Sequence, residues 1–165
     1  MSRSGFCQCE AHPIGQIGPI TNEEVVSRII FARQHIGKGG RVLPAVFPLS
    51  HIKNVGLSLV RTEKISLSDL ERFASTVAQL KSDRTWHGLI SFPAQVARDQ
   101  QIAGVRSVCL WEDPTPVDGT VPANDAHASL VANQEISDAD AMEIRARIWL
   151  TNGGVNALVT PVVSS

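Results

Sequence analysis

The proline-rich stretch 112–124 constrains the fold more than any other part of the sequence. The segments on either side of it, Val105–Trp111 and His127–Ala132, are rich in residues that favour β-strands. No helical pattern lies between them, and neighbouring parallel strands need a long crossover that is usually a helix. The two strands are therefore predicted to be antiparallel. This pair favours a mixed α+β fold over a doubly wound parallel sheet.

Further segments complete the predicted sheet. Gly56–Arg61 and Trp86–Phe92 have the composition of strands, and two prolines limit Arg41–Pro48 to a short edge strand. The Val-rich C-terminal tail is a candidate for a last strand. The predicted fold class is α+β, with a mixed, mostly antiparallel sheet of about four to five strands and about four helices.

Capping patterns mark where the helices are expected to begin and end. A Ser or Thr followed three residues later by an acidic residue is typical of a helix N-terminus, and glycines are typical of the C-terminus. The predicted helices, in chain order, are 22–32 (Thr21 with Glu24), 68–80 (Ser68 with Glu71), a short helix opened by Pro93 and ended by Gly104, and a helix that Ser137 and Asp140 begin and residues 152–154 end.

The chain of 165 residues has the length of about one domain. Residues 1–20 contain several glycines and prolines without periodicity, and we expect an irregular N-terminal arm there. Residues 21–154 are predicted to form the α+β domain, and residues 155–165 a C-terminal tail. A chain of this length buries enough surface to fold without disulfides or a structural metal, so any metal would be functional or local.

Charge and hydropathy narrow the classes of partner. Fifteen Lys and Arg against sixteen Asp and Glu give a net charge of -1, which argues against a broad phosphate-binding face and against nucleic acid as a partner. The sequence lacks the run of about eighteen apolar residues that would span a membrane. It also lacks the apolar segment behind Arg3 that a signal peptide requires. We therefore expect a cytoplasmic protein with no membrane partner.

Cys7, Cys9 and His12 form the densest group of metal-ligating residue types. Thiolate and imidazole ligands suit zinc, so these residues are the candidate metal site and zinc the candidate cofactor. The alternative is an arm in which the three side chains are neighbours by chance, because one residue separates the cysteines and no second cluster supplies a fourth ligand. Since the three cysteines are an odd number, no disulfide scaffold is expected.

Three histidines near the ends of predicted strands form a candidate catalytic site. His51 precedes one strand, His87 begins another, and His127 follows the proline-rich loop. If they converge at one end of the sheet with Arg61 and Asp125, they supply a general base, an orienting carboxylate and an anion-binding guanidinium. The alternative is that each histidine only forms local hydrogen bonds with the backbone.

No motif in the sequence fixes an activity, because the Walker spacing, the Gly-x-Ser-x-Gly elbow and the His-Glu-x-x-His helix are all absent. The low charged fraction and the Val-rich tail favour an interaction module or accessory subunit of a cytoplasmic assembly. It would bind a protein partner or a second copy of itself, with the tail adding a strand to a sheet edge. The alternative function is a small enzyme that acts on a phosphate-bearing substrate by phosphodiester hydrolysis or group transfer, through the histidines with Arg61 and Asp125.

Overall fold

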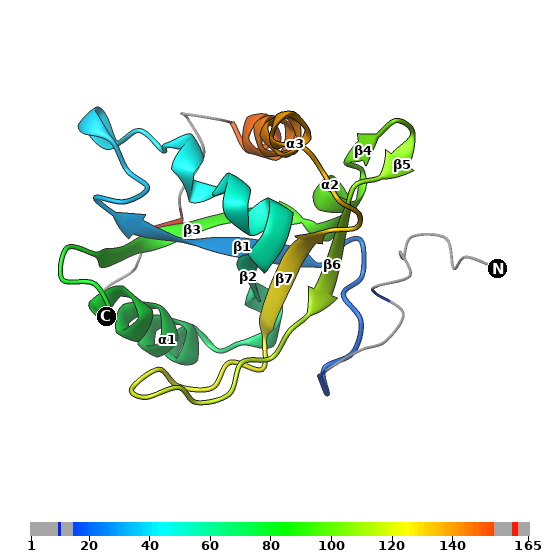
Figure 1. Ribbon diagram of the computed structural model, residues 1–165. Coiled ribbons are helices and arrows are strands. Elements are labelled where there is room, and N and C mark those ends of the chain that lie inside the picture. The colour runs from blue at the N-terminus through cyan, green and yellow to red at the C-terminus, as the bar shows by residue number, and fades with distance from the viewer. Residues whose placement is uncertain (1–9, 11–14, 154–159, 162–165) are drawn as a thin grey trace.

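An antiparallel sheet organises the computed structural model, which describes residues 10, 15–153 and 160–161. Its five longer strands lie in the order β6–β7–β2–β1–β3, and the two-residue strand β8 pairs with β3 (Figure 1). The short strands β4 and β5 form a separate hairpin. The strands are β1 (Val25–Ala32), β2 (Leu57–Arg61), β3 (Thr85–Pro93), β4 (Gln101–Ile102), β5 (Val105–Arg106), β6 (Val108–Glu112), β7 (His127–Ala132) and β8 (Thr160–Pro161).

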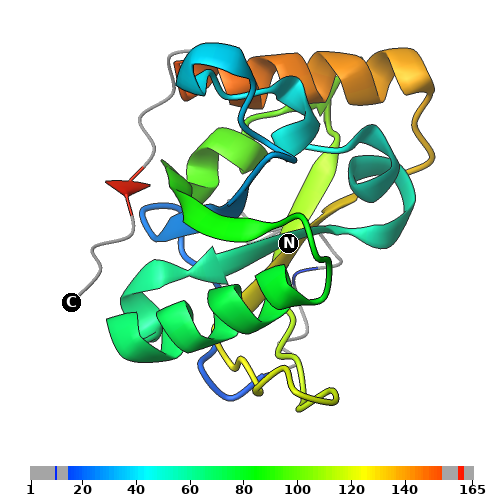
Figure 2. The same ribbon diagram turned by 90° about the vertical axis from the view of Figure 1, so that its left-hand side faces the viewer.

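Helices cover both faces of this sheet. Helix α1 (Leu67–Gln79) packs on one face, and α3 (Asp138–Thr151) lies on the other with the 3-10 turn Pro44–Val46 and the π-helical turn His51–Val55 (Figures 1 and 2). The short helix α2 (Ala94–Arg98) follows β3 directly. The remaining turns are 3-10 turns at Lys38–Gly40 and Thr62–Lys64. The predicted α+β class is confirmed, as is the antiparallel pairing of β6 with β7. The predicted number of about four helices is reached when the π-helical turn His51–Val55 is counted with α1, α2 and α3.

The predicted helix at 22–32 is wrong, because this segment is the central strand β1. The doublets Val25–Val26 and Ile29–Ile30 fit a helical spacing, but six successive residues from Val26 to Phe31 are buried. Burial on both faces gives a strand a nearly continuous apolar run instead of an alternating one. Glu24, which resembles a capping residue in sequence, instead binds the Arg61 guanidinium.

Other element boundaries shift for local reasons. The cap of helix α1 lies two residues earlier than predicted, at Ser66 instead of Ser68, because the Ser66 hydroxyl accepts the Asp69 N–H at 3.1 Å. The predicted edge strand in Arg41–Pro48 is a 3-10 turn at Pro44–Val46, where Pro44 occupies the first helical position. Gly104 does not end a helix; its φ of +77° forms the turn between β4 and β5.

Arg61 joins the ends of three strands through a buried ionic cluster. Its side chain donates to both Glu24 carboxylate oxygens, at 2.5 and 2.9 Å, and to the Gly18 carbonyl oxygen at 2.8 Å. Arg61 Nη1 also lies 3.5 Å from Glu112 Oε2. Glu24 precedes β1, Arg61 ends β2 and Glu112 ends β6. The cluster therefore fixes how these strand ends meet.

Glu10 binds the outer strand of the sheet. Its buried carboxylate lies 2.8 Å from Arg98 Nη2 and accepts the Leu110 backbone N–H at 2.7 Å. Leu110 belongs to β6, the strand at one edge of the sheet. An edge strand presents unpaired backbone groups that invite pairing with another chain. Glu10 covers one of these groups.

Replacing Arg61 with Met should lower the free energy of unfolding by about 3–5 kcal/mol, because Glu24 and Glu112 would remain buried without a counterion. Urea denaturation followed by circular dichroism measures this change. The matched control is Arg72→Met, which removes an exposed ion pair with Asp69 and should cost less than about 1 kcal/mol. Equal losses in the two variants would contradict a structural role for the Arg61 cluster.

Candidate functional site

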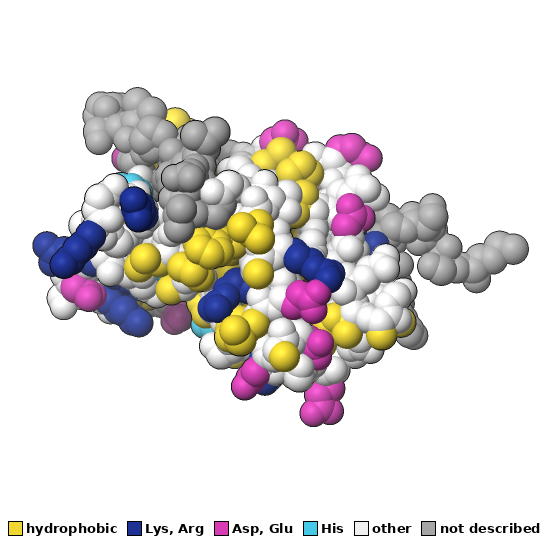
Figure 3. Space-filling model, turned by 90° about the horizontal axis from the view of Figure 1, so that it is seen from above, with side chains coloured by type: hydrophobic (Ala, Val, Ile, Leu, Met, Phe, Trp, Pro, Cys, Tyr) yellow, Lys and Arg dark blue, Asp and Glu magenta, His cyan; other side chains and the backbone are white. Residues whose placement is uncertain are grey.

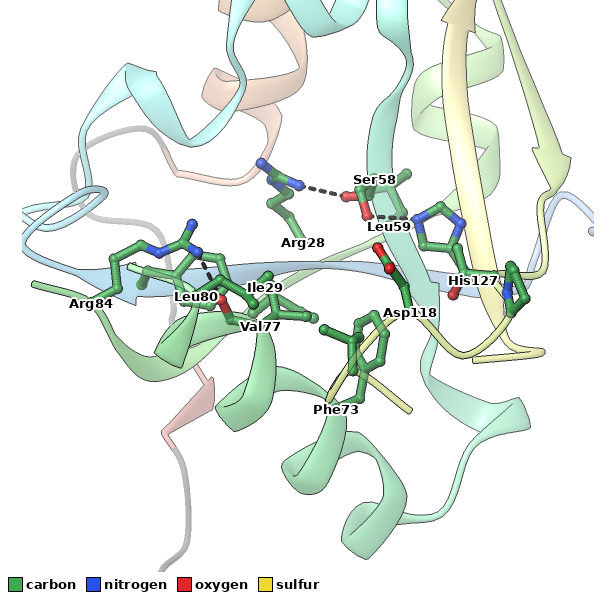
Figure 4. A pocket seen from close by; sticks show the side chains of 14 residues that line it. Arg28, Ile29, Ser58, Leu59, Phe73, Val77, Leu80, Arg84, Asp118 and His127 are labelled. Carbon is green, nitrogen blue, oxygen red and sulfur yellow. Dashed lines mark hydrogen bonds between the residues drawn. The ribbon is translucent and has the colours of Figure 1, made fainter. Parts of the chain in front are cut away.

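A cavity of about 360 Å³ lies between α1, the loop that follows β6, and strands β1 and β2 (Figure 4). Most of its lining is apolar, with Ile29 and Leu59 from the sheet and Phe73 and Val77 from α1. Polar groups lie among these side chains. They are Arg28, Ser58, Arg84, Thr115, Asp118 and His127.

Arg28 bridges a separation between β1 and β2. These strands pair only at Val26 with Arg61 and at Ser27 with Val60, whereas β1 pairs with β3 along its whole length. Beyond Ser27 the Arg28 side chain reaches toward β2 and donates to the Ser58 carbonyl oxygen at 2.8 Å (Figure 4). Its Nε donates to the Val46 carbonyl oxygen at 3.0 Å. The guanidinium thus replaces backbone pairing between the two strands.

The charge of Arg28 is buried without an acidic counterion. The residue is 9% exposed, and no carboxylate of the described residues forms an ion pair with it. Burial lowers the pKa of Arg28 to about 10, so it remains protonated at neutral pH. Buried charges in proteins are normally paired or hydrogen-bonded because desolvation is costly. Arg28 forms hydrogen bonds with two carbonyl oxygens, but no carboxylate of the described residues neutralises its charge.

Ser58 and His127 meet on the same face of adjacent strands. His127 lies opposite Val60, and Ser58 is two residues away from Val60 along β2, so the two side chains are diagonal neighbours. The Ser58 Oγ lies 2.6 Å from His127 Nε2 (Figure 4). A hydroxyl and an imidazole at this distance are the pair that activates a serine nucleophile.

The other ring nitrogen of His127 determines the direction of this hydrogen bond. His127 Nδ1 lies 2.6 Å from the Asp113 carbonyl oxygen, which only accepts, so Nδ1 must carry the proton. Burial lowers the pKa of His127, against the opposing effects of Asp113, so the ring is neutral at pH 7. In a neutral ring with the proton on Nδ1, Nε2 is an acceptor. The Ser58 hydroxyl therefore donates to His127, which is the direction that general-base catalysis requires.

Asp113 holds the His127 ring in this orientation, and hydrogen bonds to β7 fix Asp113 in turn. Its carboxylate Oδ2 lies 3.6 Å from His127 Nδ1 and accepts the Ser129 hydroxyl at 2.5 Å. The Asp113 N–H donates to the His127 carbonyl oxygen at 3.0 Å, which fixes the start of the loop against β7. Ser58, His127 and Asp113 therefore have the arrangement that a nucleophile, a base and an orienting group require.

The predicted catalytic residues occupy different parts of the structure. His127 lies at the cavity, His51 begins the π-helical turn, and both His87 and Asp125 are exposed. Arg61 is held in its ionic cluster. No hydrogen bond or ion pair joins any two of these five residues, all of which lie within the described ranges. Burial, followed by the charge of Arg28, lowers the pKa of His51, and its Nδ1 is buried without a hydrogen-bond partner among the described residues.

Ser58, Arg28 and Asp113 are the site residues that the sequence-based prediction misses. Arg28 had a visible signal, because it is the one charged residue within the apolar segment Val25–Ala32. Ser58 and Asp113 had none, since a serine in a strand and an acidic residue before a proline are common. Their role depends on the strand register and the loop path.

The predicted zinc ligands Cys7, Cys9 and His12 lie outside the described residues, so this site stays a prediction. Elsewhere, within 15–153 and at Glu10, no group of three or more His, Cys, Asp or Glu side chains could hold a metal ion. Cys109, on the buried strand β6, is disulfide-bonded. The sequence-based expectation that there is no disulfide scaffold did not predict this single bond.

Comparison with protein-family models, with curated proteins and with solved structures finds no match to this chain. The site must therefore be interpreted from its own geometry.

The free energy of unfolding should fall as the pH falls from about 6.5 to about 4. Burial, followed by the charges of Arg28 and Arg84, lowers the pKa of His35 from 6.5 to about 4. In this range the unfolded state binds the proton and the folded state does not, so stability rises with pH. Urea unfolding at several pH values measures the slope.

The variant His35→Asn should have a smaller slope, because the Asn oxygen can still accept the Phe31 N–H that His35 Nδ1 accepts at 3.1 Å. His87→Asn, at an exposed position on β3, is the control. A slope that is the same in wild type and His35→Asn would contradict the assignment of this pH dependence to His35.

Proposed function

We propose that this protein is a hydrolase or acyl transferase that uses Ser58 as the nucleophile and His127 as the general base. The observation that carries this proposal is the 2.6 Å contact between Ser58 Oγ and His127 Nε2, with the ring fixed by Asp113. The apolar lining of the adjacent cavity favours a carboxylic ester with a small apolar group as substrate.

The chemistry follows from the positions of these groups. Ser58 Oγ attacks the ester carbonyl carbon while its proton moves to His127 Nε2, which forms an O–C bond and an imidazolium. Asp113 stabilises the imidazolium, and the positive charge of Arg28 stabilises the negative oxygen of the tetrahedral intermediate. The intermediate collapses when His127 returns the proton to the leaving alkoxide. Water or another alcohol then attacks the acyl-serine while His127 removes its proton. The second tetrahedral intermediate releases the acid or the new ester, and His127 returns the proton to Ser58 Oγ as the bond between the serine and the acyl group breaks.

This proposal revises the enzyme hypothesis made from the sequence. One histidine, His127, takes the role that three histidines were expected to share. Arg28 replaces Arg61 as the guanidinium at the site, and Asp113 replaces Asp125 as the acidic group beside the imidazole. A carboxylic ester replaces the phosphodiester as the group that reacts, because the apolar side chains beside Ser58 suit a neutral reacting group.

The interaction-module hypothesis remains a second proposal, and one observation favours it. Apolar side chains gather on the face of the molecule that carries α3 (Figure 3), where Val55, Met142 and Leu150 are exposed. Patches of this kind often bind another protein. The predicted strand addition by the tail has less support, because Thr160–Pro161 pairs with β3 of the same chain.

A cytoplasmic location also stays a proposal. None of the helices within the described residues is long and apolar enough to cross a membrane. The disulfide at Cys109 weighs against a reducing compartment, because disulfides are rare in the cytosol.

A fluorophosphonate probe should label Ser58 covalently, because the hydroxyl oxygen displaces fluoride from phosphorus while His127 accepts the proton. Mass spectrometry of the digested protein locates the label. Ser58→Ala should abolish labelling, and His127→Ala should slow it by at least about a hundredfold. Ser91→Ala is the matched control, since the Ser91 hydroxyl also lies on a strand but bonds to Ser27 instead of a histidine. Undiminished labelling of Ser58→Ala, or no labelling of the wild type, would overturn the proposal.

The rate of labelling should decrease at acid pH with a midpoint below 6.5. Burial lowers the pKa of His127 from this value, and only the neutral ring accepts the Ser58 proton. Rates measured from about pH 4.5 to about pH 8 on folded protein determine the midpoint. A midpoint above 6.5 would contradict a buried, neutral His127 as the base.

A further inference from the structure

We infer that the cavity binds ligands that join a small apolar body to an oxyanion, a carboxylate or a phosphate, and that Arg28 binds the oxyanion. This inference deepens the proposed function by naming the class of product, a carboxylate, and of anions that resemble it, and it rests on that function only for the identity of the site. The binding itself requires no reaction at Ser58.

The hydrogen-bonding capacity of Arg28 is the first argument. A guanidinium has five N–H donors. Arg28 uses its Nε–H on the Val46 carbonyl and one Nη1–H on the Ser58 carbonyl. Among the described residues nothing accepts from its other three N–H groups. These groups belong to a residue that is nine-tenths buried and lines the cavity.

The second argument is charge. Arg61 and Arg98 are also buried, and each has a carboxylate partner, Glu24 and Glu10 respectively. Arg84, the other cavity arginine, has its Nη groups bound to the Val77 carbonyl and the Gln34 side chain and lies over the Phe31 ring at 4.6 Å. Arg84 Nε is also buried without a hydrogen-bond partner among the described residues, but Arg84 as a whole is only half-buried, whereas Arg28 is 9% exposed. Of the two cavity arginines without a carboxylate partner, Arg28 therefore carries the more strongly desolvated charge. Such a site favours an anion, and the guanidinium geometry suits carboxylate and phosphate oxygens.

The third argument is the shape of the ligand that fits. Arg28 and Ser58 lie at one side of the cavity, while Phe73, Val77 and Leu80 of α1 line the other (Figure 4). A volume of about 360 Å³ accepts a small molecule. A ligand whose oxyanion contacts Arg28 can therefore place an aromatic or short aliphatic group against α1. Asp118 is exposed at the cavity, where its carboxylate lies between Ser58 and Phe73 (Figure 4), and it would disfavour a ligand with a second negative charge.

Binding is tested on the Ser58→Ala protein, so that the result does not depend on catalysis. Phenyl phosphate, benzoate and benzyl alcohol serve as probes, with NMR chemical shifts of the His127 ring and of arginine Nε–H groups as the readout. Both anions should bind and shift the His127 and Arg28 resonances, and benzyl alcohol should bind at least about tenfold more weakly. Equal binding of benzyl alcohol, or no binding of either anion, would overturn the inference.

Arginine variants locate the anion. Arg28→Met in the Ser58→Ala background should weaken benzoate binding at least about tenfold, whereas Arg72→Met, on the exposed face of α1, should leave it unchanged. A loss on Arg84→Met without a loss on Arg28→Met would overturn the assignment. If Arg28→Met fails to fold, the shift of the Arg28 resonance in the folded Ser58→Ala protein decides the question.

The two proposals fail separately. Anion binding to Ser58→Ala with no probe labelling of the wild type would refute the serine nucleophile and support the anion site. Labelling of Ser58 in the wild type without anion binding to Ser58→Ala would support the serine nucleophile and refute the anion site.

Discussion

The early separation of β1 from β2 is the constraint on which the site depends. These central strands pair at two positions only, next to the Arg61 cluster that holds their ends together. Beyond these positions the backbone groups that face the gap need other partners, because an unpaired buried carbonyl costs as much as a lost hydrogen bond. Arg28 donates a hydrogen bond to the Ser58 carbonyl oxygen and another to the Val46 carbonyl oxygen. A polar group thus lies where a continuous sheet would have left only backbone pairs and apolar side chains.

The electrostatics of the site follow from this arrangement. Arg28 places a positive charge near three histidines, and the pKa values of His35, His51 and His127 are all lowered by burial with a further contribution from this charge. Neutral rings are the result at pH 7. For His127 the neutral state has a chemical consequence, since the Asp113 carbonyl fixes the proton on Nδ1 and leaves Nε2 free to accept from Ser58. The guanidinium that fills the gap therefore also helps to keep the base unprotonated.

Local sequence patterns were sufficient for most elements of the fold. The strand His127–Ala132 has its predicted bounds, because the proline-rich loop before it is a local signal. The last helix has its predicted cap at Ser137, because a capping box is also a local signal. β1 was mistaken for a helix because burial on both faces hides the alternation that marks a strand. The expected meeting of the histidines with Arg61 and Asp125 depended on long-range geometry. The register of β2 against β7 determines which side chain lies beside His127, and in this register Ser58 is its diagonal neighbour.

The dual role of Arg28 connects ligand binding to the stability of the sheet. Two of its donors hold β1 and β2 together, and an anion on the remaining donors would lower the cost of keeping its charge away from water. An anionic ligand would then bind the folded state and not the unfolded one, so it would stabilise the fold by mass action. The same coupling limits which substitutions the site tolerates. A lysine at position 28 keeps the charge but lacks the planar donor arrangement that reaches both carbonyls. Removing the charge altogether would leave the Ser58 carbonyl without its donor, next to the hydroxyl that we assign as the nucleophile.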